Sequence, residues 1–319
     1  MTARIIMKME VCDARGVTDA VRTYTFRHPR RVHLPPPIPG AHVDVRLPNG
    51  KTRQYSLCGD PDDDTSYTIA VKREEEGRGG SRWIHDNVGV GSTVPVSAPR
   101  NNFPLAEGAV RHVFIAGGIG ITPIIAMTRY LARRDMPFEL HYCAHESRTA
   151  PFLPALRDIC GTQRLSTYFS DAGDQPSDRL NVEPLLKSVT PGIHVYCCGP
   201  QRLTHAFRAA AINWPEPYVH FEVFKPTLDE SFVAEPFDVK LASTGEVLRI
   251  PANRSALDVL RGHGIALPSS CELGVCGACE CRYLDGTVIH RDSVLDVAAR
   301  QDRMMLCVSR ARVSVTLDI

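Results

Sequence analysis

Four cysteines in the last third of the chain have the side-chain type and the spacing of a metal site. Cys271, Cys276 and Cys279 lie in one short stretch and Cys307 follows much later, so the pattern is C-x4-C-x2-C and then a distant C. Thiolates are soft ligands that suit iron–sulfur clusters or zinc. The residues between these cysteines include two glycines and an alanine. These small residues let the backbone wrap closely around an inorganic core and point N–H groups at its sulfurs.

The spacing favours one of these metals. Structural zinc sites more often consist of two C-x2-4-C or H-x3-5-H pairs. Three cysteines in one loop with a distant fourth is the ligand pattern of a plant-type [2Fe–2S] centre. We therefore predict a [2Fe–2S] cluster, with zinc as the alternative. A one-electron centre needs a source of electrons, so the rest of the chain should contain one.

The composition is that of a globular protein with more than one domain. The chain has 319 residues, a length that predicts two or three domains. It contains 37 basic and 36 acidic residues. A net charge near zero indicates neither nucleic acid nor an anionic membrane as a partner. The N-terminus lacks a signal peptide and no long apolar run predicts a membrane helix. Eleven cysteines, seven of them outside the predicted ligand set, fit a reducing compartment, so we expect a cytoplasmic protein.

The first hundred residues predict an antiparallel barrel that carries two short motifs. Short strands are expected at 5–11, 21–26, 42–47, 67–72 and 93–97. Arg53-Gln54-Tyr55-Ser56 offers a guanidinium fork for phosphate and a tyrosine that can flank an aromatic ring. Gly79-Gly80-Ser81 begins a short helix, whose N-terminus can bind phosphate, while Ser81 could equally be a helix N-cap.

The middle of the chain predicts an open parallel sheet. An apolar strand at 112–116 runs into Gly117-Gly118-Ile119-Gly120-Ile121-Thr122-Pro123, then a helix at 124–133 and a strand at 139–144. Such a glycine loop lets the backbone approach a dinucleotide pyrophosphate at a helix N-terminus, although it lacks the G-x-G-x-x-G pattern. No acidic residue ends the second strand to hold a ribose, and Ser147 and Arg148 follow instead.

Three further strands complete this sheet, at 165–170, 194–198 and 219–224, and the second of them ends in Cys198-Gly199-Pro200. Ligands of open parallel sheets bind beyond the carboxyl ends of the strands, where this segment and the glycine loop both lie. A connector at 225–236 then leads to two strands, a helix at 255–263, the cysteine loop and a final strand at 313–317, the order of a β-grasp ferredoxin.

Together these motifs resemble the ferredoxin–NADP reductase superfamily, and their order with a C-terminal ferredoxin is similar to the phthalate dioxygenase reductase family. The resemblance covers essentially the whole chain and implies a multidomain α/β plus β protein. The expected domains are an FMN-binding antiparallel β-barrel (1–106), a Rossmann-like parallel-sheet NAD(H) domain (107–225), a linker (226–235) and a β-grasp [2Fe–2S] domain (236–319).

The resemblance also implies roles for individual residues. Arg53 would contact the flavin phosphate, Tyr55 and Phe224 would pack on the flavin ring, and Ser56 would lie near its N5 edge. Cys198 would lie near the nicotinamide C4, with Cys197 pointing the other way. The expected FMN site comprises Arg53, Gln54, Tyr55, Ser56, Ala70, Val71, Lys72, Gly79, Gly80, Ser81 and Phe224. The expected NADH site comprises Gly117, Gly118, Gly120, Ile121, Thr122, Pro123, Ser147, Arg148, Asp171, Cys198, Gly199 and Pro200.

The family pattern also selects Cys279 over its neighbour Cys281 as a ligand, and it gives His290 no ligand role. Asp171 would repel the 2′-phosphate of NADPH, which favours NADH, although Ser147 and Arg148 could serve NADPH. The implied activity is NADH-dependent electron transfer through FMN and [2Fe–2S] to a Rieske-type oxygenase, by a monomer. Rival readings are a stand-alone NADH oxidoreductase for quinones, ferric complexes or nitro compounds, a redox sensor or zinc-binding adaptor, and an FAD-containing relative.

Overall fold

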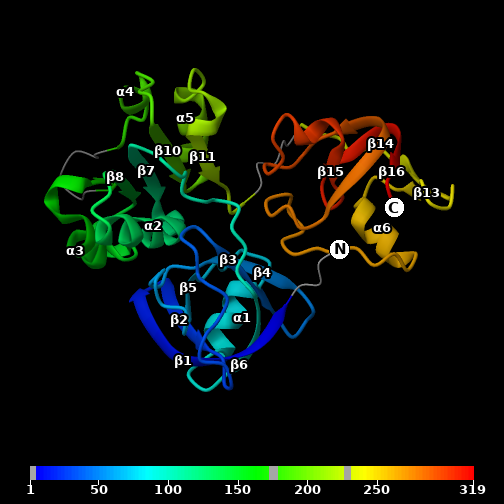
Figure 1. Cartoon of the computed structure of the whole chain (residues 1–319). Coiled ribbons are helices and arrows are strands. Elements are labelled where there is room, and N and C mark those ends of the chain that lie inside the picture. Colours follow the sequence, from blue (N-terminus) through cyan, green and yellow to red (C-terminus); the bar gives the residue numbers. More distant parts are fainter. Residues whose placement is uncertain (1–4, 172–178, 226–230) are drawn as a thin grey trace. The chain divides into compact units, whose positions relative to one another are not determined.

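The computed structural model describes residues 5–171, 179–225 and 231–319, which form two compact units, Met1–Val223 and Phe224–Ile319 (Figure 1). The first unit contains an antiparallel and a parallel sheet, and the second contains a mixed sheet. The three sheets follow one another along the chain without exchanging strands. The fold class predicted from the sequence is confirmed.

The first sheet is an antiparallel barrel. Its strand order is β4-β3-β6-β1-β2-β5, and a bridge between Leu57 and Ile69 joins the two edges. Closure leaves no edge strand open to other chains. Helix α1 packs on the barrel core through Ile84. The elements are β1 (Ile6–Thr18), β2 (Val21–Arg27), β3 (His42–Arg46), β4 (Thr52–Ser56), β5 (Tyr67–Lys72), α1 (Gly80–Asn87) and β6 (Thr93–Ser97).

The second sheet is parallel, in the order β11-β10-β7-β8-β9. Its strands are apolar because separate cores cover its two faces. The strand order reverses between β7 and β10, where ligands of such sheets bind. The elements are β7 (Arg111–Gly117), η1 (Gly118–Gly120), α2 (Ile121–Arg133), β8 (Phe138–Ala144), η2 (Ser147–Thr149), α3 (Leu153–Arg164), β9 (Leu165–Phe169), α4 (Glu183–Leu186), β10 (Ile193–Cys198), α5 (Gln201–Ala210), η3 (Glu216–Tyr218) and β11 (Val219–Glu222).

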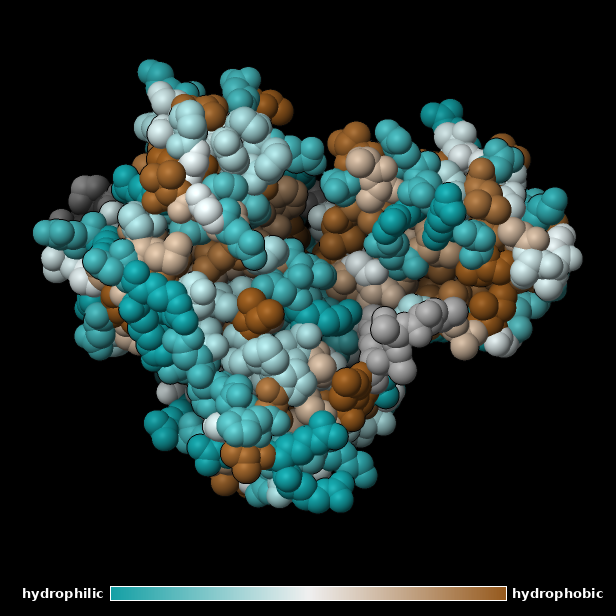
Figure 2. Space-filling view, in the orientation of Figure 1, coloured by the Kyte–Doolittle hydropathy of each residue, from teal (hydrophilic) through white to brown (hydrophobic). Residues whose placement is uncertain are grey.

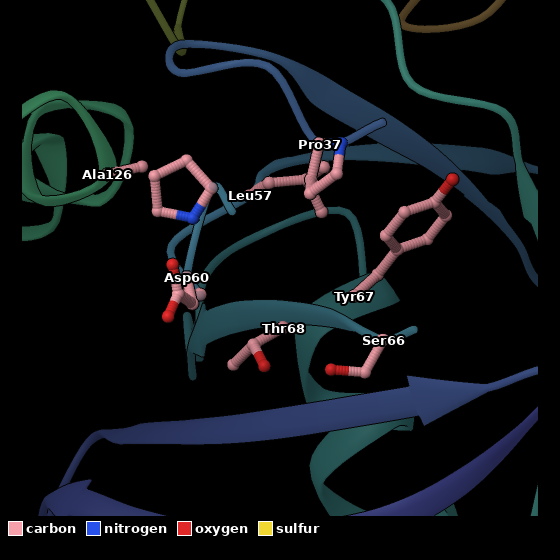
Figure 3. Close-up of a pocket in the computed structure, with 9 residues that line it drawn as sticks. Pro37, Leu57, Asp60, Ser66, Tyr67, Thr68 and Ala126 are labelled. Carbon is pink, nitrogen blue, oxygen red and sulfur yellow. The ribbon is translucent and has the colours of Figure 1, made fainter. Parts of the chain in front are cut away.

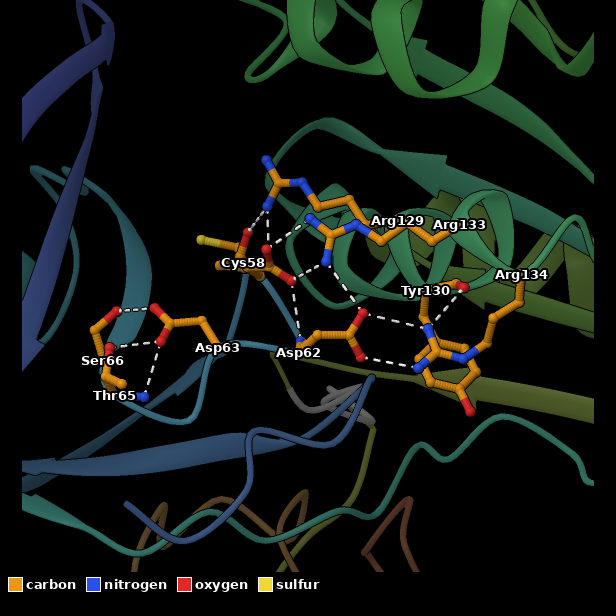
Figure 4. A network of polar contacts seen from close by, with 11 residues as sticks. Cys58, Asp62, Asp63, Thr65, Ser66, Arg129, Tyr130, Arg133 and Arg134 are labelled. Atoms are coloured by element: carbon orange, nitrogen blue, oxygen red, sulfur yellow. Dashed lines mark hydrogen bonds and ion pairs between the residues drawn. The ribbon is translucent and has the colours of Figure 1, made fainter. Parts of the chain in front are cut away.

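Helix α2 ties the parallel sheet to the barrel through a row of arginines (Figure 4). Arg129 donates to the carbonyl oxygens of Cys58 (2.6 Å) and Gly59 (3.0 Å). Arg133 binds Asp60 and Asp62, and Arg134 binds Asp62. These carbonyls and carboxylates belong to the loop that directly follows β4, while the other end of α2 follows the glycine loop. One helix therefore connects the two predicted cofactor motifs.

A cavity beside this contact is too small to hold a cofactor. It has a volume of about 10 Å³ and is lined by Leu57, Tyr67, Ala126 and neighbouring residues (Figure 3). A single water molecule needs about this much space. The cavity is therefore a packing gap between the barrel and α2.

The second unit is a β-grasp domain whose mixed sheet has the order β13-β12-β16-β14-β15, with β12 and β16 parallel. Ser255 caps the helix α6, because its hydroxyl accepts the N–H of Asp258 at 3.1 Å. The elements are β12 (Phe237–Leu241), β13 (Val247–Ile250), α6 (Ala256–Gly262), β14 (Glu280–Ile289), η4 (Ala299–Gln301), β15 (Arg303–Met305) and β16 (Arg310–Leu317).

Several predicted boundaries were wrong. The Arg-Gln-Tyr-Ser motif follows the turn at 48–51, as expected, and forms the strand β4, which the sequence analysis did not list. Strand β11 ends at Glu222 instead of Phe224. Ser81 is not the N-cap of α1, because Gly79 takes that position and the Ser81 hydroxyl accepts the N–H of Glu74 at 3.1 Å.

Figure 2 shows hydrophobic side chains scattered over a largely hydrophilic face. Exposed large apolar residues such as Val32, Ile212 and Val313 are isolated in sequence, which is normal for globular proteins. None of the helices in the described ranges has the length and apolarity to span a membrane.

Candidate electron-transfer sites

Arg53 lies at the N-terminus of α1, in an arrangement that fits a phosphate group. Its guanidinium donates to the carbonyl oxygen of Arg78 at 3.3 Å. A Cβ on Gly80 would lie 2.6 Å from Arg53 Nε, so only glycine lets the arginine cross the helix start. The first turn of α1 has no acidic residue and no side-chain cap. The Arg53 cation and the positive N-terminal end of α1 would repel each other unless an anion lay between them. This arrangement therefore fits a phosphate group.

Most of the other residues predicted to bind flavin make contacts within the barrel itself. Gln54 donates to the buried Asp44 at 3.2 Å, which Arg100 also holds. Ala70 and Val71 are buried in different cores, on opposite sides of β5. The side chain of Lys72 forms an ion pair with Glu74. Tyr55 is half-buried against the barrel core, and burial raises the pKa of its phenol.

The end of β4 meets the end of the parallel sheet within the same unit. Ser56 is buried there, and its hydroxyl is hydrogen-bonded to Glu222, the last residue of β11. Cys198, the last residue of β10, is fully buried and pairs in register with Glu222 and with Ala116. Cys198 and Cys197 belong to different cores, so they point to opposite faces as predicted. Phe224 opens the second unit, so its predicted contact with the flavin remains a prediction.

Burial keeps the side chains of Glu222 and Cys198 protonated. Desolvation raises the pKa of Glu222 to about 8, and the hydrogen bond from Ser56 offsets only part of that. Glu222 Oε2 is buried without a hydrogen-bond partner among the described residues. Burial, with Glu222 and Cys197 nearby, raises the pKa of the Cys198 thiol well above its usual value. Cys198 is therefore a thiol, not a nucleophilic thiolate.

Glu222 is a site residue that the sequence analysis missed. Its signal was a single carboxylate within the apolar strand pattern of residues 219–224. Sequence alone does not fix which residue of a neighbouring strand lies beside it. The ladder of the sheet supplies that information, because it pairs Glu222 directly with Cys198.

The glycine loop packs directly against the end of β10. A Cβ on Gly120 would lie 2.3 Å from the carbonyl oxygen of Cys198, and a Cβ on Gly117 would lie 2.6 Å from the Pro200 ring. These glycines are therefore required for the close packing of the two strand ends at the switch point. Gly118, with φ of +52°, has open space around its Cβ position, so its backbone is accessible to a ligand.

The helix start after this loop is rigid. Ile121, Thr122 and Pro123 are buried, and the Thr122 hydroxyl donates to the carbonyl oxygen of Ile119 at 3.0 Å. The Tyr142 hydroxyl donates to the carbonyl oxygen of Gly118 or Pro151, at 3.2 and 3.1 Å. Gly199 packs on Gly117 from the neighbouring strand end. The loop predicted to bind the pyrophosphate is thus fixed by contacts with Thr122, Tyr142 and Gly199.

The far edge of the sheet carries more negative charge than the sequence suggested. Arg148, exposed after β8, forms an ion pair with Glu146. Ser147 is exposed beside it, and the backbone N–H of Asp171 donates to the carbonyl oxygen of His145 at 2.8 Å. The carboxylates of Glu146 and Asp171 lie close together. No acidic residue ends β8, as the sequence analysis noted, but Glu146 comes two residues after it and neutralises Arg148.

The four predicted ligand cysteines gather in the second unit. All four are buried, and none forms a disulfide. The thiol of Cys276 is hydrogen-bonded to Cys271, and the thiol of Cys307 to Cys279. Two close thiol pairs match a cluster of two irons held by four cysteines. Positive φ angles at Glu272 (55°), Gly274 (71°) and Gly277 (70°) allow the loop to curl around them.

Backbone N–H groups point at these sulfurs, as the small residues of the loop predicted. Leu273 N lies 3.3 Å from Cys271 Sγ, and Ala278 N lies 3.5 Å from Cys276 Sγ. Within the first pair, the hydrogen bond and nearby backbone N–H groups lower the pKa of Cys271, while the same hydrogen bond raises the pKa of Cys276. Such a donor set stabilises thiolates, so the residues present fit an iron–sulfur cluster.

Two other candidate ligands are engaged elsewhere. The Cys281 thiol, on β14, donates to the carbonyl oxygen of Arg282 at 3.4 Å, and burial raises its pKa to about 11. His290 Nε2 donates to the carbonyl oxygen of Arg300 at 3.1 Å, and Nδ1 faces Asp292 at 3.6 Å. The ligand set predicted from spacing is thus the one whose four thiols lie together.

Comparison with known proteins agrees with this geometry. Residues 239–312 match the family model of the 2Fe-2S iron-sulfur cluster binding domain, which favours the cluster over zinc. The chain is 43% identical over 323 residues to the phthalate 4,5-dioxygenase oxygenase reductase subunit of Pseudomonas putida, and the match covers 99% of this chain and 96% of the relative.

Two solved structures also match over almost the whole chain. Phthalate dioxygenase reductase, described as a modular structure for electron transfer from pyridine nucleotides to [2Fe-2S], is 35% identical with a TM-score of 0.74, covering 99% of this chain and 98% of that one. An intact type IV self-sufficient cytochrome P450 monooxygenase is 39% identical with a TM-score of 0.87, covering 99% of this chain but 41% of that one. The chain belongs to the phthalate dioxygenase reductase family of iron–sulfur flavoprotein oxidoreductases.

Proposed function

We propose that this chain is the reductase component of a two-component Rieske-type aromatic oxygenase or O-demethylase. It takes hydride from NADH to FMN and passes single electrons through the [2Fe–2S] cluster to the oxygenase. The observation that carries the proposal is the meeting of Ser56, Cys198 and Glu222 at the switch point of one unit, with four buried, paired thiols in the other unit.

In this proposal, each group of residues has one task. Arg53 and the N-terminus of α1 bind the flavin phosphate, and the loop from Gly117 to Pro123 binds the pyrophosphate of NADH. Buried Cys198 keeps water away from the nicotinamide and presents no charge to it. Glu222 holds a proton beside Ser56 near neutral pH. No general base is needed, because the flavin and the cluster carry the redox chemistry when bound.

The choice of NADH rests on charge at the sheet edge. Glu146 neutralises Arg148, and Asp171 adds a second carboxylate nearby. A 2′-phosphate would meet net negative charge there, whereas a ribose hydroxyl can donate to a carboxylate. The test compares kcat/KM for NADH and NADPH. A preference for NADPH would contradict this assignment.

The acceptor is tested by reconstitution. The purified protein should show flavin and [2Fe–2S] absorption bands with stoichiometric iron, and acid-released flavin should run as FMN. NADH oxidation should stay slow alone and rise when a Rieske-type oxygenase encoded beside this chain is added with its substrate. Fast turnover with quinones or ferric complexes, and no stimulation by the oxygenase, would instead favour a stand-alone oxidoreductase.

A second acceptor class has a specific observation in its favour. The similarity to the reductase part of a self-sufficient cytochrome P450 extends over 99% of this chain. A haem-containing oxygenase is therefore the second candidate partner, and the same stimulation assay separates it from a Rieske protein. We further propose the domain limits 1–106, 107–225 and 236–319, and a monomer, which sedimentation of the purified protein would test.

A further inference from the structure

A buried aspartate lies behind the cysteine loop and takes no part in the ligand set. The carboxylate of Asp292 is fully buried. Its Oδ2 accepts the backbone N–H groups of Val294 at 3.2 Å and Leu295 at 2.9 Å, which closes a tight turn. A buried carboxylate is costly unless it holds something in place, so the function of this turn requires an explanation.

The turn is attached to the middle of the cysteine loop. The N–H of Ser293 donates to the carbonyl oxygen of Gly274 at 3.0 Å. A Cβ on Gly274 would lie 3.2 Å from Asp292 Cα and 2.5 Å from the Val308 side chain. Gly274 is therefore enclosed between the Asp292 turn and the segment that carries Cys307.

Gly274 in turn reaches the last ligand. Its Cβ position meets Val308, the residue after Cys307, and its backbone N–H favours the thiolate of Cys307, the predicted ligand that lies outside the loop. Gly274 has a φ of +71°, so the direction of this N–H depends on a backbone conformation that the turn and Val308 hold from either side. A chain of contacts thus runs from the Asp292 carboxylate, through Ser293 and Gly274, to the sulfur of Cys307.

The turn is also held from behind. Arg300 Nη2 donates to the carbonyl oxygen of Asp292 at 2.9 Å and lies 3.6 Å from Oδ2. His290 Nε2 donates to the carbonyl oxygen of Arg300 at 3.1 Å, and its Nδ1 lies 3.6 Å from Asp292 Oδ1. Asp292 is therefore the centre of a buried network and not an isolated turn residue.

We propose that Asp292 is a positioning residue for the cluster: it holds the Gly274 N–H against Cys307 Sγ and so keeps the reduction potential of the cluster high. Hydrogen bonds to the sulfurs stabilise the extra negative charge of the reduced cluster, which raises its potential. This inference deepens the proposed function, because it assumes that the four thiols hold a [2Fe–2S] cluster.

Two substitutions separate position from charge. Asp292→Glu keeps the negative charge but moves the carboxylate by one methylene, so the turn is lost and the potential should fall. Asp292→Asn keeps an oxygen that can accept the N–H groups of Val294 and Leu295 but removes the charge, so the potential should stay or rise. Asp296→Glu is the matched control, because Asp296 accepts the Ala299 N–H at 2.7 Å in an exposed turn without the Gly274 contact.

The readouts act on the cluster itself. A redox titration of the holoprotein followed by electron paramagnetic resonance measures the potential. Resonance Raman spectra in light and heavy water report the N–H···S bonds, and the deuterium shift of the Fe–S(Cys) bands should shrink in Asp292→Glu and persist in Asp292→Asn and Asp296→Glu. If Asp292→Glu does not assemble a cluster, Asp292→Ala replaces it, because it removes the acceptor and the charge without adding volume, and its potential should lie below that of Asp292→Asn, which lacks the charge but keeps the acceptor.

The outcomes separate this inference from the proposed function. Equal potentials in the wild type and Asp292→Glu, or a rise in Asp292→Ala equal to that of Asp292→Asn, would overturn the positioning role while leaving the cluster assignment intact. Absence of stoichiometric iron and of a cluster signal from the wild-type protein would instead overturn the proposed function.

Discussion

The buried carboxyl of Glu222 makes the stability of the first unit depend on pH in an unusual direction. Burial raises the pKa of Glu222 from its ordinary 4.5 to about 8. The folded chain therefore keeps this proton between about pH 4.5 and 8, whereas the unfolded chain releases it. Since the folded state binds more protons, stability should fall as pH rises through this window.

The magnitude follows from the size of the shift. One pKa unit corresponds to about 1.4 kcal/mol, so a shift of roughly 3.5 units corresponds to about 5 kcal/mol across the whole window. Water that reaches the ionised carboxylate and the hydrogen bond from Ser56 both reduce the cost, so this figure is an upper limit. Between pH 6 and 8 we expect about 2 kcal/mol.

The assay compares the wild type with Glu222→Gln, which is isosteric and cannot ionise. The wild type should show an infrared band of a protonated carboxylic acid that disappears with a midpoint near pH 8, and Glu222→Gln should lack it. In urea unfolding of the first unit, the advantage of Glu222→Gln over the wild type should grow with pH from 6 to 8.

Glu139→Gln is the control of opposite sign. His141 and Arg111 lower the pKa of Glu139, so its contribution is present at neutral pH and is lost as pH falls through that lowered pKa. The loss caused by Glu139→Gln should therefore shrink in acid. If the Glu222→Gln advantage did not change with pH, or if no carboxylic acid band titrated near pH 8, the account of this site would be wrong.

Three further perturbations test the positioning of the two sites. Gly120→Ala places a Cβ 2.3 Å from the Cys198 carbonyl oxygen, so we expect about 2 kcal/mol of destabilisation and at least about a tenfold rise in KM for NADH, whereas Gly89→Ala, in open space outside the predicted NADH loop, should leave KM unchanged. Arg129→Met removes the hydrogen bonds of a guanidinium to two carbonyl oxygens, so it should cost about 1.5–3 kcal/mol of stability and slow flavin reduction. The exposed Arg134→Met is the control and should not slow flavin reduction. Equal rates in the two variants would argue against the alignment of the two cofactor motifs by α2. Cys276→Ser should remove the cluster absorption and leave NADH-to-flavin reduction intact, and loss of both would refute the separation of the two sites.

The sequence predicted the sheets better than the side-chain contacts. Glycines and the cysteine spacing report local backbone requirements, so the position of the Gly117–Pro123 loop and the grouping of the four cysteines could be predicted. Contacts between residues distant in sequence could not. Glu222 lies beside Cys198 because of strand register, and Asp292 reaches Gly274 through a turn that periodicity does not reveal.

The two sites treat buried groups in opposite ways, and this difference matches their chemistry. Around Glu222 and Cys198, burial raises both pKa values, so protons are retained and the proposed place of hydride transfer stays neutral. Around the four cysteines, backbone N–H groups of Leu273 and Ala278 point at the sulfurs of Cys271 and Cys276, so negative charge is stabilised in an equally buried place. A hydride acceptor benefits from surroundings that hold protons, whereas a cluster that gains a bare electron needs N–H donors to hold charge. The two environments thus belong to different compact units of the chain.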